Sequence, residues 1–247
     1  MRRIAVVMAM RAEAAPLLAA LRAEPVAKPD IAAGLPSAWY EAHRGDVLVT
    51  VAINGVDPRH GVDAIGSQPA ALNTWVTLTN RPSDLVISAG TAGGWASRGS
   101  KIGDVYVSKD RVVYHDRRIA LPGFDAYGIG SFPTVDASSL AAELGLKEAI
   151  VTTGNSLDES EDDRRMIAAT GAAVKDMEAA AVADVAEHLG VPMLAVKAIT
   201  DLVDLPVDTV EQFTRNLRLA TARLCDATLA VLDWCERREV SDSGGWR

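Results

Sequence analysis

The segment Leu85-Val86-Ile87-Ser88-Ala89-Gly90-Thr91-Ala92-Gly93-Gly94 joins a short apolar run to a stretch of small residues. Its first half is largely apolar rather than alternating, which is typical of a strand buried on both faces of a sheet. Comparable runs occupy residues 4–8, 47–52, 105–107, 149–152 and 193–199. Because strands of this type are covered by helices on both faces, these runs favour an α/β fold.

Helical patterns lie between these runs. They cover residues 11–21, 61–77, 137–143, 164–169, 177–189 and 210–236, and the second of them contains Pro69. The pattern at 177–189 is followed by Gly190 and Pro192, which are common stop signals. The alternation of strands and helices predicts a single-domain, three-layer α/β/α sandwich around a mixed, mostly parallel central sheet.

The chain has 247 residues, of which 49% are hydrophobic, and this size suits one large domain. We place the domain at residues 1–240 and expect residues 241–247 to be a disordered tail. The first apolar run meets Arg11 and Glu13, so we interpret it as a strand and not as a signal peptide. No apolar run approaches the roughly 18 residues of a membrane span. We therefore expect a cytoplasmic protein.

The net charge of −8 and the pI near 5 would repel a phosphate backbone, so nucleic acid is not an expected partner. Cys225 and Cys235 belong to one helical pattern, in which ten residues span about 15 Å. That distance is too long for a disulfide, and we expect two core thiols in a reducing compartment.

Ligands of open α/β sheets bind beyond the carboxyl ends of the strands. Unusual residues follow several of the apolar runs, at positions 9–13, 90–94, 153–158 and 200–201. If these strands are neighbours, carboxylates and glycine-exposed backbone converge on one crevice.

Each of these features also has a structural interpretation. Glu13 lies in the first turn of a helix and can complement its dipole. Residues 90–94 lack the spacing of a dinucleotide fingerprint and the lysine of a P-loop, which favours a flexible loop over an anion cradle. Asp201 can cap a helix or belong to a turn. Glu178 opens a closely packed helix of small residues, where an acid needs partners such as ribose hydroxyls.

Taken together, the motifs resemble those of the 5′-methylthioadenosine/S-adenosylhomocysteine nucleosidases, and the plant-type methylthioadenosine nucleosidases most closely. The matching segments are Ala9-Met10-Arg11-Ala12-Glu13-Ala14, Ser88-Ala89-Gly90-Thr91-Ala92-Gly93-Gly94, Val113-Tyr114-His115-Asp116-Arg117-Arg118, Lys175-Asp176-Met177-Glu178 and Lys197-Ala198-Ile199-Thr200-Asp201-Leu202-Val203-Asp204. The resemblance runs from Ile4 to about Trp234. It implies a nucleoside phosphorylase-like fold and hydrolysis of the N-glycosidic bond of 5′-methylthioadenosine in methionine salvage, without a cofactor. S-adenosylhomocysteine and other 5′-substituted adenosines are further candidate substrates.

The same resemblance implies roles for single residues. Asp201 is the general acid that protonates N7 of adenine, and Glu13 orients the attacking water. Glu178 holds the ribose hydroxyls with the backbone near Met177, and Met10 packs on the sugar. Such an acid at the base and a carboxylate near the sugar suit a reaction that passes through an oxocarbenium-like ribose.

Further binding residues follow from the resemblance. Leu157 lies beside the adenine ring and the backbone of Asp158 reads its edge. Phe213 covers the 5′-alkylthio group, together with Phe124 and Tyr127. The remaining binding positions are Thr91, Ala92, Gly93, Thr200 and Lys197, the last of which helps to hold the water.

Three other functions stay open at this point. A phosphate-dependent purine nucleoside phosphorylase is favoured by Arg59 and the Asn54-Gly55-Val56 turn, but the negative charge of Glu13 would repel phosphate. A non-catalytic nucleoside-binding protein should have lost some of its acids, yet all of them are present. A nucleosidase of the menaquinone pathway would share the same machinery and differ at the 5′ pocket.

The chain departs from the family pattern at Gly154-Asn155-Ser156, where the family usually has an aspartate in the middle position. Trp95 is also unexpected. The four histidines lack ligand spacing, so no metal site is expected, and His115 is interpreted as a structural or pocket-lining residue. By resemblance we expect a homodimer with residues 122–127 at the interface.

Overall fold

The computed structural model describes residues 2–238 and residue 246. Its strands are β1 (Arg3–Met8), β2 (Glu24–Val26), β3 (Ala38–Arg44), β4 (Val47–Ile53), β5 (Leu85–Gly94), β6 (Val105–Tyr114), β7 (Phe132–Pro133), β8 (Lys147–Thr153), β9 (Val174–Asp176) and β10 (Met193–Leu202). Its helices are α1 (Arg11–Leu21), α2 (Ser67–Asn80), α3 (Asp125–Ile129), α4 (Ser138–Leu144), α5 (Glu161–Thr170), α6 (Ala179–His188) and α7 (Thr209–Glu236). Two short 3₁₀ helices, η1 (Asp30–Ala32) and η2 (Ala96–Arg98), complete the described elements.

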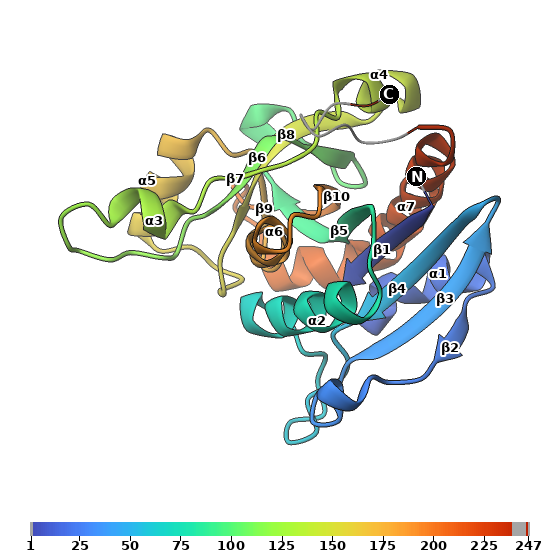
Figure 1. The fold of residues 1–247 in the computed structure, drawn as a ribbon. Coiled ribbons are helices and arrows are strands. Elements are labelled where there is room, and N and C mark those ends of the chain that lie inside the picture. Colours follow the sequence, from blue (N-terminus) through green and yellow to red (C-terminus); the bar gives the residue numbers. More distant parts are fainter. Residues whose placement is uncertain (1, 239–245, 247) are drawn as a thin grey trace.

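The strands form one ten-stranded mixed sheet with the order β10-β6-β8-β9-β5-β1-β4-β3-β2, and β7 pairs with β6. The central strands β4, β1, β5 and β10 are parallel neighbours. Helices α2 and α6 pack together on one face, and α1 and α7 pack together on the other (Figure 1). The α/β sandwich predicted from the alternation of strands and helices is confirmed.

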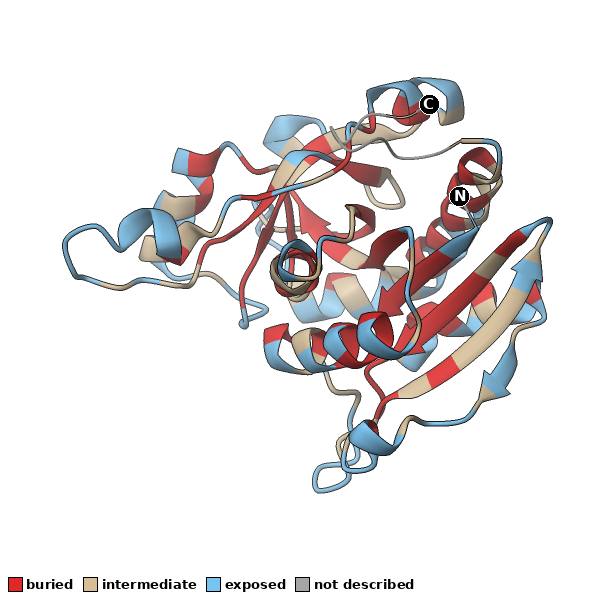
Figure 2. Cartoon of the chain, in the orientation of Figure 1, coloured by how far each residue is buried: buried red, intermediate tan, exposed pale blue. Residues whose placement is uncertain are grey.

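Burial on both faces of the sheet is clearest in β1. Ile4, Val6 and Met8 belong to the core beside α1 and α7, whereas Ala5 and Val7 belong to the core beside α2 and α6. All of these side chains are buried, and Figure 2 shows the same pattern along the central strands. The continuous apolar run is therefore explained by two separate cores.

The sheet also closes on itself, which the sequence did not predict. Strand β10 pairs with β5 in parallel and with β6 in antiparallel orientation. Because β6, β8, β9 and β5 follow one another in the sheet, these strands and β10 form a closed ring, from which β1, β4, β3 and β2 extend.

Several element boundaries differ from the prediction. Residues 90–94, expected to form a flexible loop, continue β5 and pair with β10 and β9. Helix α2 begins at Ser67 and not at residue 61, which places Pro69 in the first turn, where its missing N–H is not needed. Strand β3 was not predicted, because only Trp39 among its residues is buried and several of its side chains are polar.

The C-terminal helix α7 carries both cysteines as free, buried thiols, as predicted. Asp208 caps the helix by accepting a hydrogen bond from the backbone N–H of Glu211 at 2.9 Å. Of the predicted tail at 241–247, only Trp246 is among the described residues. Its ring meets that of Trp234 edge to face, with 4.8 Å between centroids. None of the described helices is both long and apolar enough to cross a membrane.

Candidate active site

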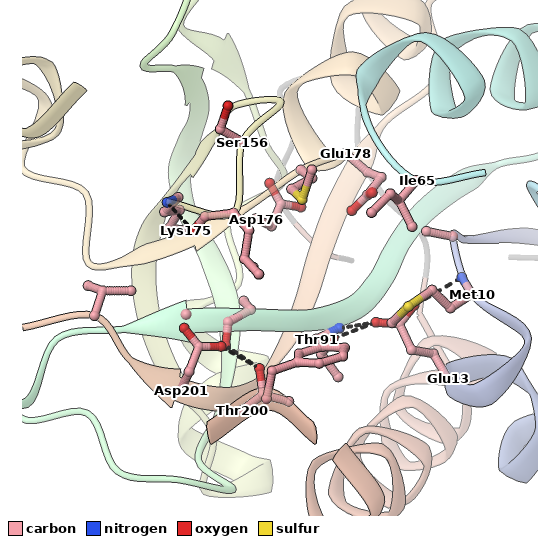
Figure 3. A pocket seen from close by; sticks show the side chains of 17 residues that line it. Met10, Glu13, Ile65, Thr91, Ser156, Lys175, Asp176, Glu178, Thr200 and Asp201 are labelled. Carbon is pink, nitrogen blue, oxygen red and sulfur yellow. Dashed lines mark hydrogen bonds between the residues drawn. The ribbon is translucent and has the colours of Figure 1, made fainter. Parts of the chain in front are cut away.

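A cavity of about 360 Å³ opens where β1, β5 and β10 end and β9 pairs with the last residues of β5 (Figure 3). The residues that line it are Ala9, Met10, Glu13, Ile65, Thr91, Ala92, Gly93, Ser156, Leu157, Lys175, Asp176, Met177, Glu178, Thr200, Asp201, Val203 and Phe213. Strands that are far apart in the sequence meet here because β5 pairs with β1, β9 and β10. The crevice predicted from the strand ends is present.

Glu13 is held by three hydrogen bonds. Its Oε1 accepts from the backbone N–H and the hydroxyl of Thr91, both at 2.6 Å, and its Oε2 accepts from the backbone N–H of Met10 at 3.2 Å. Burial raises the pKa of Glu13, whereas the bonds from Thr91 and the charge of Lys197 lower it. The carboxyl group lies in the first turn of α1 and also lines the cavity, so its structural and functional interpretations are compatible.

A buried ion pair joins Lys197 to Asp176, which lines the cavity. The ammonium of Lys197 is 2.7 Å from Oδ2 of Asp176 and donates to the hydroxyl of Ser88 at 3.1 Å. Burial acts to lower the pKa of Lys197, but the carboxylates of Asp176, Glu178 and Glu13 raise it above its usual value. Lys197 therefore stays charged and neutralises part of the acidic cluster. It was expected to help hold water, but its side chain is not part of the cavity lining.

Glu178 precedes the first residue of α6 and faces the cavity. Its Oε1 accepts a hydrogen bond from the backbone N–H of Gly66 at 2.9 Å. Burial and the negative charge of Asp176 together raise the pKa of Glu178 to about 7, although the positive charge of Lys197 acts in the opposite direction. The sequence predicted that an acid at this helix entry would be desolvated, and the structure gives it one backbone donor.

Asp201 lies on β10, opposite a glycine of β5. Its Oδ1 accepts a hydrogen bond from the hydroxyl of Thr200 at 2.7 Å. A Cβ atom at Gly93 would lie 2.8 Å from Oδ2 of Asp201 and 2.8 Å from Val203, so a larger residue would displace the carboxyl group. Burial raises the pKa of Asp201, whereas Thr200 and Lys175 lower it. A raised pKa suits a group that has to donate a proton near neutral pH.

The loop at residues 155–159 forms another wall. Lys175 donates to the backbone carbonyls of Leu157 and Asp158, at 2.9 and 2.8 Å. The wall of the cavity at Leu157 is thus formed by a loop whose backbone is bonded to a buried ammonium group. Asp158, whose backbone was expected to read adenine, is not among the residues that line the cavity.

Asn155, the departure from the family pattern, joins three segments. Its Oδ1 accepts from the backbone N–H and the hydroxyl of Ser67, at 2.9 and 2.8 Å. Its own backbone N–H and amide donate to Oδ2 of Asp116, at 2.7 and 3.0 Å. An aspartate at position 155 could not supply the amide donor. Asn155 therefore suits a position next to the carboxylate of Asp116.

Phe124 and Tyr127, expected at the 5′ side, are exposed and do not line this cavity. They pack against each other edge to face, with 6.0 Å between centroids. His115 is buried against Gly154: a Cβ atom added at Gly154 would lie 2.2 Å from Nε2 of His115. We therefore interpret His115 as a structural residue. Trp95 packs against the guanidinium of Arg98, 5.4 Å from the ring centroid.

Some lining residues had no role in the sequence prediction. These are Ala9, Ile65, Ser156, Lys175, Asp176 and Val203. Lys175 and Asp176 belong to a motif that the sequence did single out. Their charged side chains next to Glu178 could have indicated that they also line the site. Ile65 gave no signal, because it lies in a segment that was predicted to be helical. In the described part of the chain, no cluster of His, Cys, Asp and Glu side chains is arranged to hold a metal ion.

The comparison with known families places this site in a class. Residues 3–233 match the model of the phosphorylase superfamily, so the chain is a member of that superfamily. The chain is 40% identical to the 5′-methylthioadenosine nucleosidase of Arabidopsis thaliana over 236 residues, which cover 96% of this chain and 88% of the relative. It is 38% identical to the 5′-methylthioadenosine/S-adenosylhomocysteine nucleosidase of the same plant over 239 residues, which cover 97% of this chain and 94% of the relative.

Solved structures agree. The apo form of the Arabidopsis thaliana 5′-methylthioadenosine nucleosidase superposes with a TM-score of 0.94 at 39% identity, over 98% of this chain and 99% of that one. Within the superfamily, this chain therefore belongs to the 5′-methylthioadenosine nucleosidase family.

Proposed function

We propose that this chain is an N-ribosyl hydrolase that cleaves 5′-methylthioadenosine to adenine and 5-methylthioribose, a reaction of methionine salvage. The observation that carries the proposal is the convergence of Glu13, Glu178 and Asp201 on one cavity from three different elements (Figure 3). Cleavage of this bond places positive charge on the ribose and negative charge on the base. Three carboxyl groups with different environments can serve these separate needs.

Asp201 is the proposed general acid. As the bond from C1′ to N9 breaks, electrons move into the adenine ring, and a proton from Asp201 to N7 makes adenine a neutral leaving group. The pKa of Asp201 is raised by burial, so a larger fraction carries the proton at neutral pH than for an ordinary aspartate.

Glu13 and Glu178 act on the sugar side. The three hydrogen bonds to Glu13 fix its carboxylate, which can then accept a proton from a water molecule that attacks C1′. Glu178 is placed to accept hydrogen bonds from the ribose 2′- and 3′-hydroxyls, and Met10 packs on the ring. Bound hydroxyls would also give Glu178 partners that favour its charged form.

The pocket beyond the ribose favours a short 5′ group. Ile65 and Phe213 line the cavity with apolar side chains that suit a methylthio substituent. The homocysteine group of S-adenosylhomocysteine would need a partner for its carboxylate. We therefore propose 5′-methylthioadenosine as the preferred substrate and S-adenosylhomocysteine as a poorer one.

A phosphorylase would need free cations for phosphate. Among the described lining residues the cation is Lys175, and it is engaged with two carbonyls and Glu159. Arg59 is 80% exposed, pairs with Asp57 and does not line the cavity. These contacts support water as the nucleophile.

For the assembly we propose a homodimer in the cytoplasm, with no nucleic acid partner. The exposed apolar side chains of Leu72 and Trp75 on α2 and of Phe124 and Tyr127 around α3 support such an interface. In the dimer, residues 122–127 would lie near the 5′ pocket of the neighbouring copy. Sedimentation velocity at several concentrations tests this: a species of one chain's mass at all of them would contradict it.

The experiment that tests the activity is adenine release from 5′-methylthioadenosine in phosphate-free buffer with EDTA. Wild type should release adenine under these conditions, and Asp201→Asn should not. Release that requires phosphate would make the chain a phosphorylase. Binding without release would make it a nucleoside-binding protein.

A further inference from the structure

Lys175 on β9 is a buried lysine with an unusual set of partners. Its ammonium donates to the carbonyls of Leu157 and Asp158 at 2.9 and 2.8 Å and lies 3.5 Å from Oε1 of Glu159. Its side chain is 4% exposed and that of Glu159 is 9% exposed. Three consecutive residues of one loop are therefore attached to one charged group.

Burying an ammonium group is costly unless its donors are satisfied. Lys175 meets this requirement entirely with the loop that forms the wall beside Leu157. The side chains of Leu157 and Asp158 add little packing that would hold the loop between its two ends, since Leu157 is 42% exposed and Asp158 is exposed as well. The position of its backbone thus depends on the strand behind it.

We propose that Lys175 is a positioning residue that fixes the base-binding loop at residues 157–159 and thereby sets the affinity for adenine. The binding of adenine by this loop rests on the proposed function. The attachment of the loop to Lys175 does not rest on it.

The same pair of charges faces the proposed general acid. The groups that act on Asp201 are Lys175 on β9, Glu159 in the loop and the hydroxyl of Thr200 on its own strand. Lys175 lowers the pKa of Asp201, and Glu159 raises it. Lys175 thus has an effect on the pH dependence of the reaction that a purely structural lysine would lack.

The test uses variants that separate the two effects. Glu159→Gln keeps the hydrogen bonds from Lys175 to the loop and removes one charge. The double variant Lys175→Met with Glu159→Gln removes the hydrogen bonds and leaves no unpaired buried charge. Lys147→Met is the matched control, because Lys147 also donates to a backbone carbonyl and a carboxylate, those of Gly99 and Asp104, outside the cavity.

The first readout is hydrogen exchange of peptides that cover residues 155–160 in the ligand-free protein. We expect faster exchange in the double variant than in Glu159→Gln or Lys147→Met. Equal exchange in the double variant and in Glu159→Gln would overturn the proposal, whether or not the chain is a nucleosidase. A wild type that releases no adenine would refute the proposed function alone.

The second readout is kinetic. Loss of the charge-assisted bonds should raise KM for 5′-methylthioadenosine on the order of tenfold in the double variant, with a smaller change in kcat. The alkaline limb of the activity profile should lie at lower pH in Glu159→Gln than in the double variant, because only the former keeps the Lys175 charge. Coincident limbs would show that Lys175 has no influence on Asp201.

Discussion

Replacing Glu178 with glutamine should stabilise the ligand-free protein above neutral pH and at the same time remove its activity. The pKa of Glu178 is raised from 4.5 to about 7 by burial and by the charge of Asp176. Between these two pH values the folded state binds more protons than the unfolded state, so stability falls as the pH rises through this interval. Above pH 7 the cost of the ionised carboxylate is fully present.

The magnitude follows from the size of this pKa difference. About 2.5 pH units correspond to about 3 kcal/mol, and solvent screening of the partly exposed Glu178 reduces this to roughly 2–3 kcal/mol. Glutamine has the same shape, and its amide oxygen can still accept from the backbone N–H of Gly66. For a domain of this size the gain should raise Tm by about 4–12 °C at pH 8.

The assay is thermal or urea unfolding of wild type and Glu178→Gln at pH 5 and pH 8. The stability difference between them should be small at pH 5 and should grow toward pH 8. Glu24→Gln is the matched control, because Glu24 is exposed on the edge strand β2. A difference that does not change with pH, or a variant less stable than wild type at pH 8, would show that ionised Glu178 does not destabilise the folded protein. Activity of the variant should fall about a hundredfold or more, as expected for lost charged hydrogen bonds to two hydroxyls.

Three further predictions concern the same cavity. Asp201→Asn should fold normally and lose adenine release by a factor of about 10² or more, the usual contribution of a general acid; wild-type rates in the variant would contradict its role. Gly93→Ala should lower kcat about tenfold, because its Cβ atom would meet Oδ2 of Asp201 at 2.8 Å. The control Gly34→Ala, whose Cβ atom would have no atom within 4 Å, should leave kcat unchanged. Equal rates in both variants would count against this crowding. Asn155→Asp should destabilise the protein by about 1–2 kcal/mol in urea unfolding, because a second carboxylate would face Asp116. Adding Asp116→Asn should restore part of this loss. Additive effects of the two changes would disprove the contact.

Much of the fold was accessible from the sequence because its signals are local. An apolar run located β1, and clear helical patterns located α1 and α7, all closely; similar runs located the first half of β5 and most of β10. The pairing of β10 with both β5 and β6 depends on contacts between distant segments, for which a single sequence carries no signal. The strands β9 and β3 were missed because their local patterns are weak: β9 is short and β3 is largely half-exposed.

For the candidate site too, some features were predictable from the sequence and others were not. The acids were found because each follows a strand end or opens a helix, and the glycines of β5 were found as a motif. That Gly93 makes room for Asp201 became clear only from the structure. The attachment of the base-binding loop to Lys175 likewise joins segments that are separated in the sequence, so it could not be predicted from local patterns.

The proposal that water, and not phosphate, attacks the ribose can be tested by turnover of 5′-methylthioadenosine in ¹⁸O-labelled water with phosphate present, followed by mass spectrometry of the sugar product. Glu13 lies on the proposed nucleophile side, and no lining residue in the described part of the chain offers a free cation. We therefore expect free 5-methylthioribose that carries one ¹⁸O atom at C1 from the start of the reaction. A 1-phosphate ester of the sugar as the first product would contradict it.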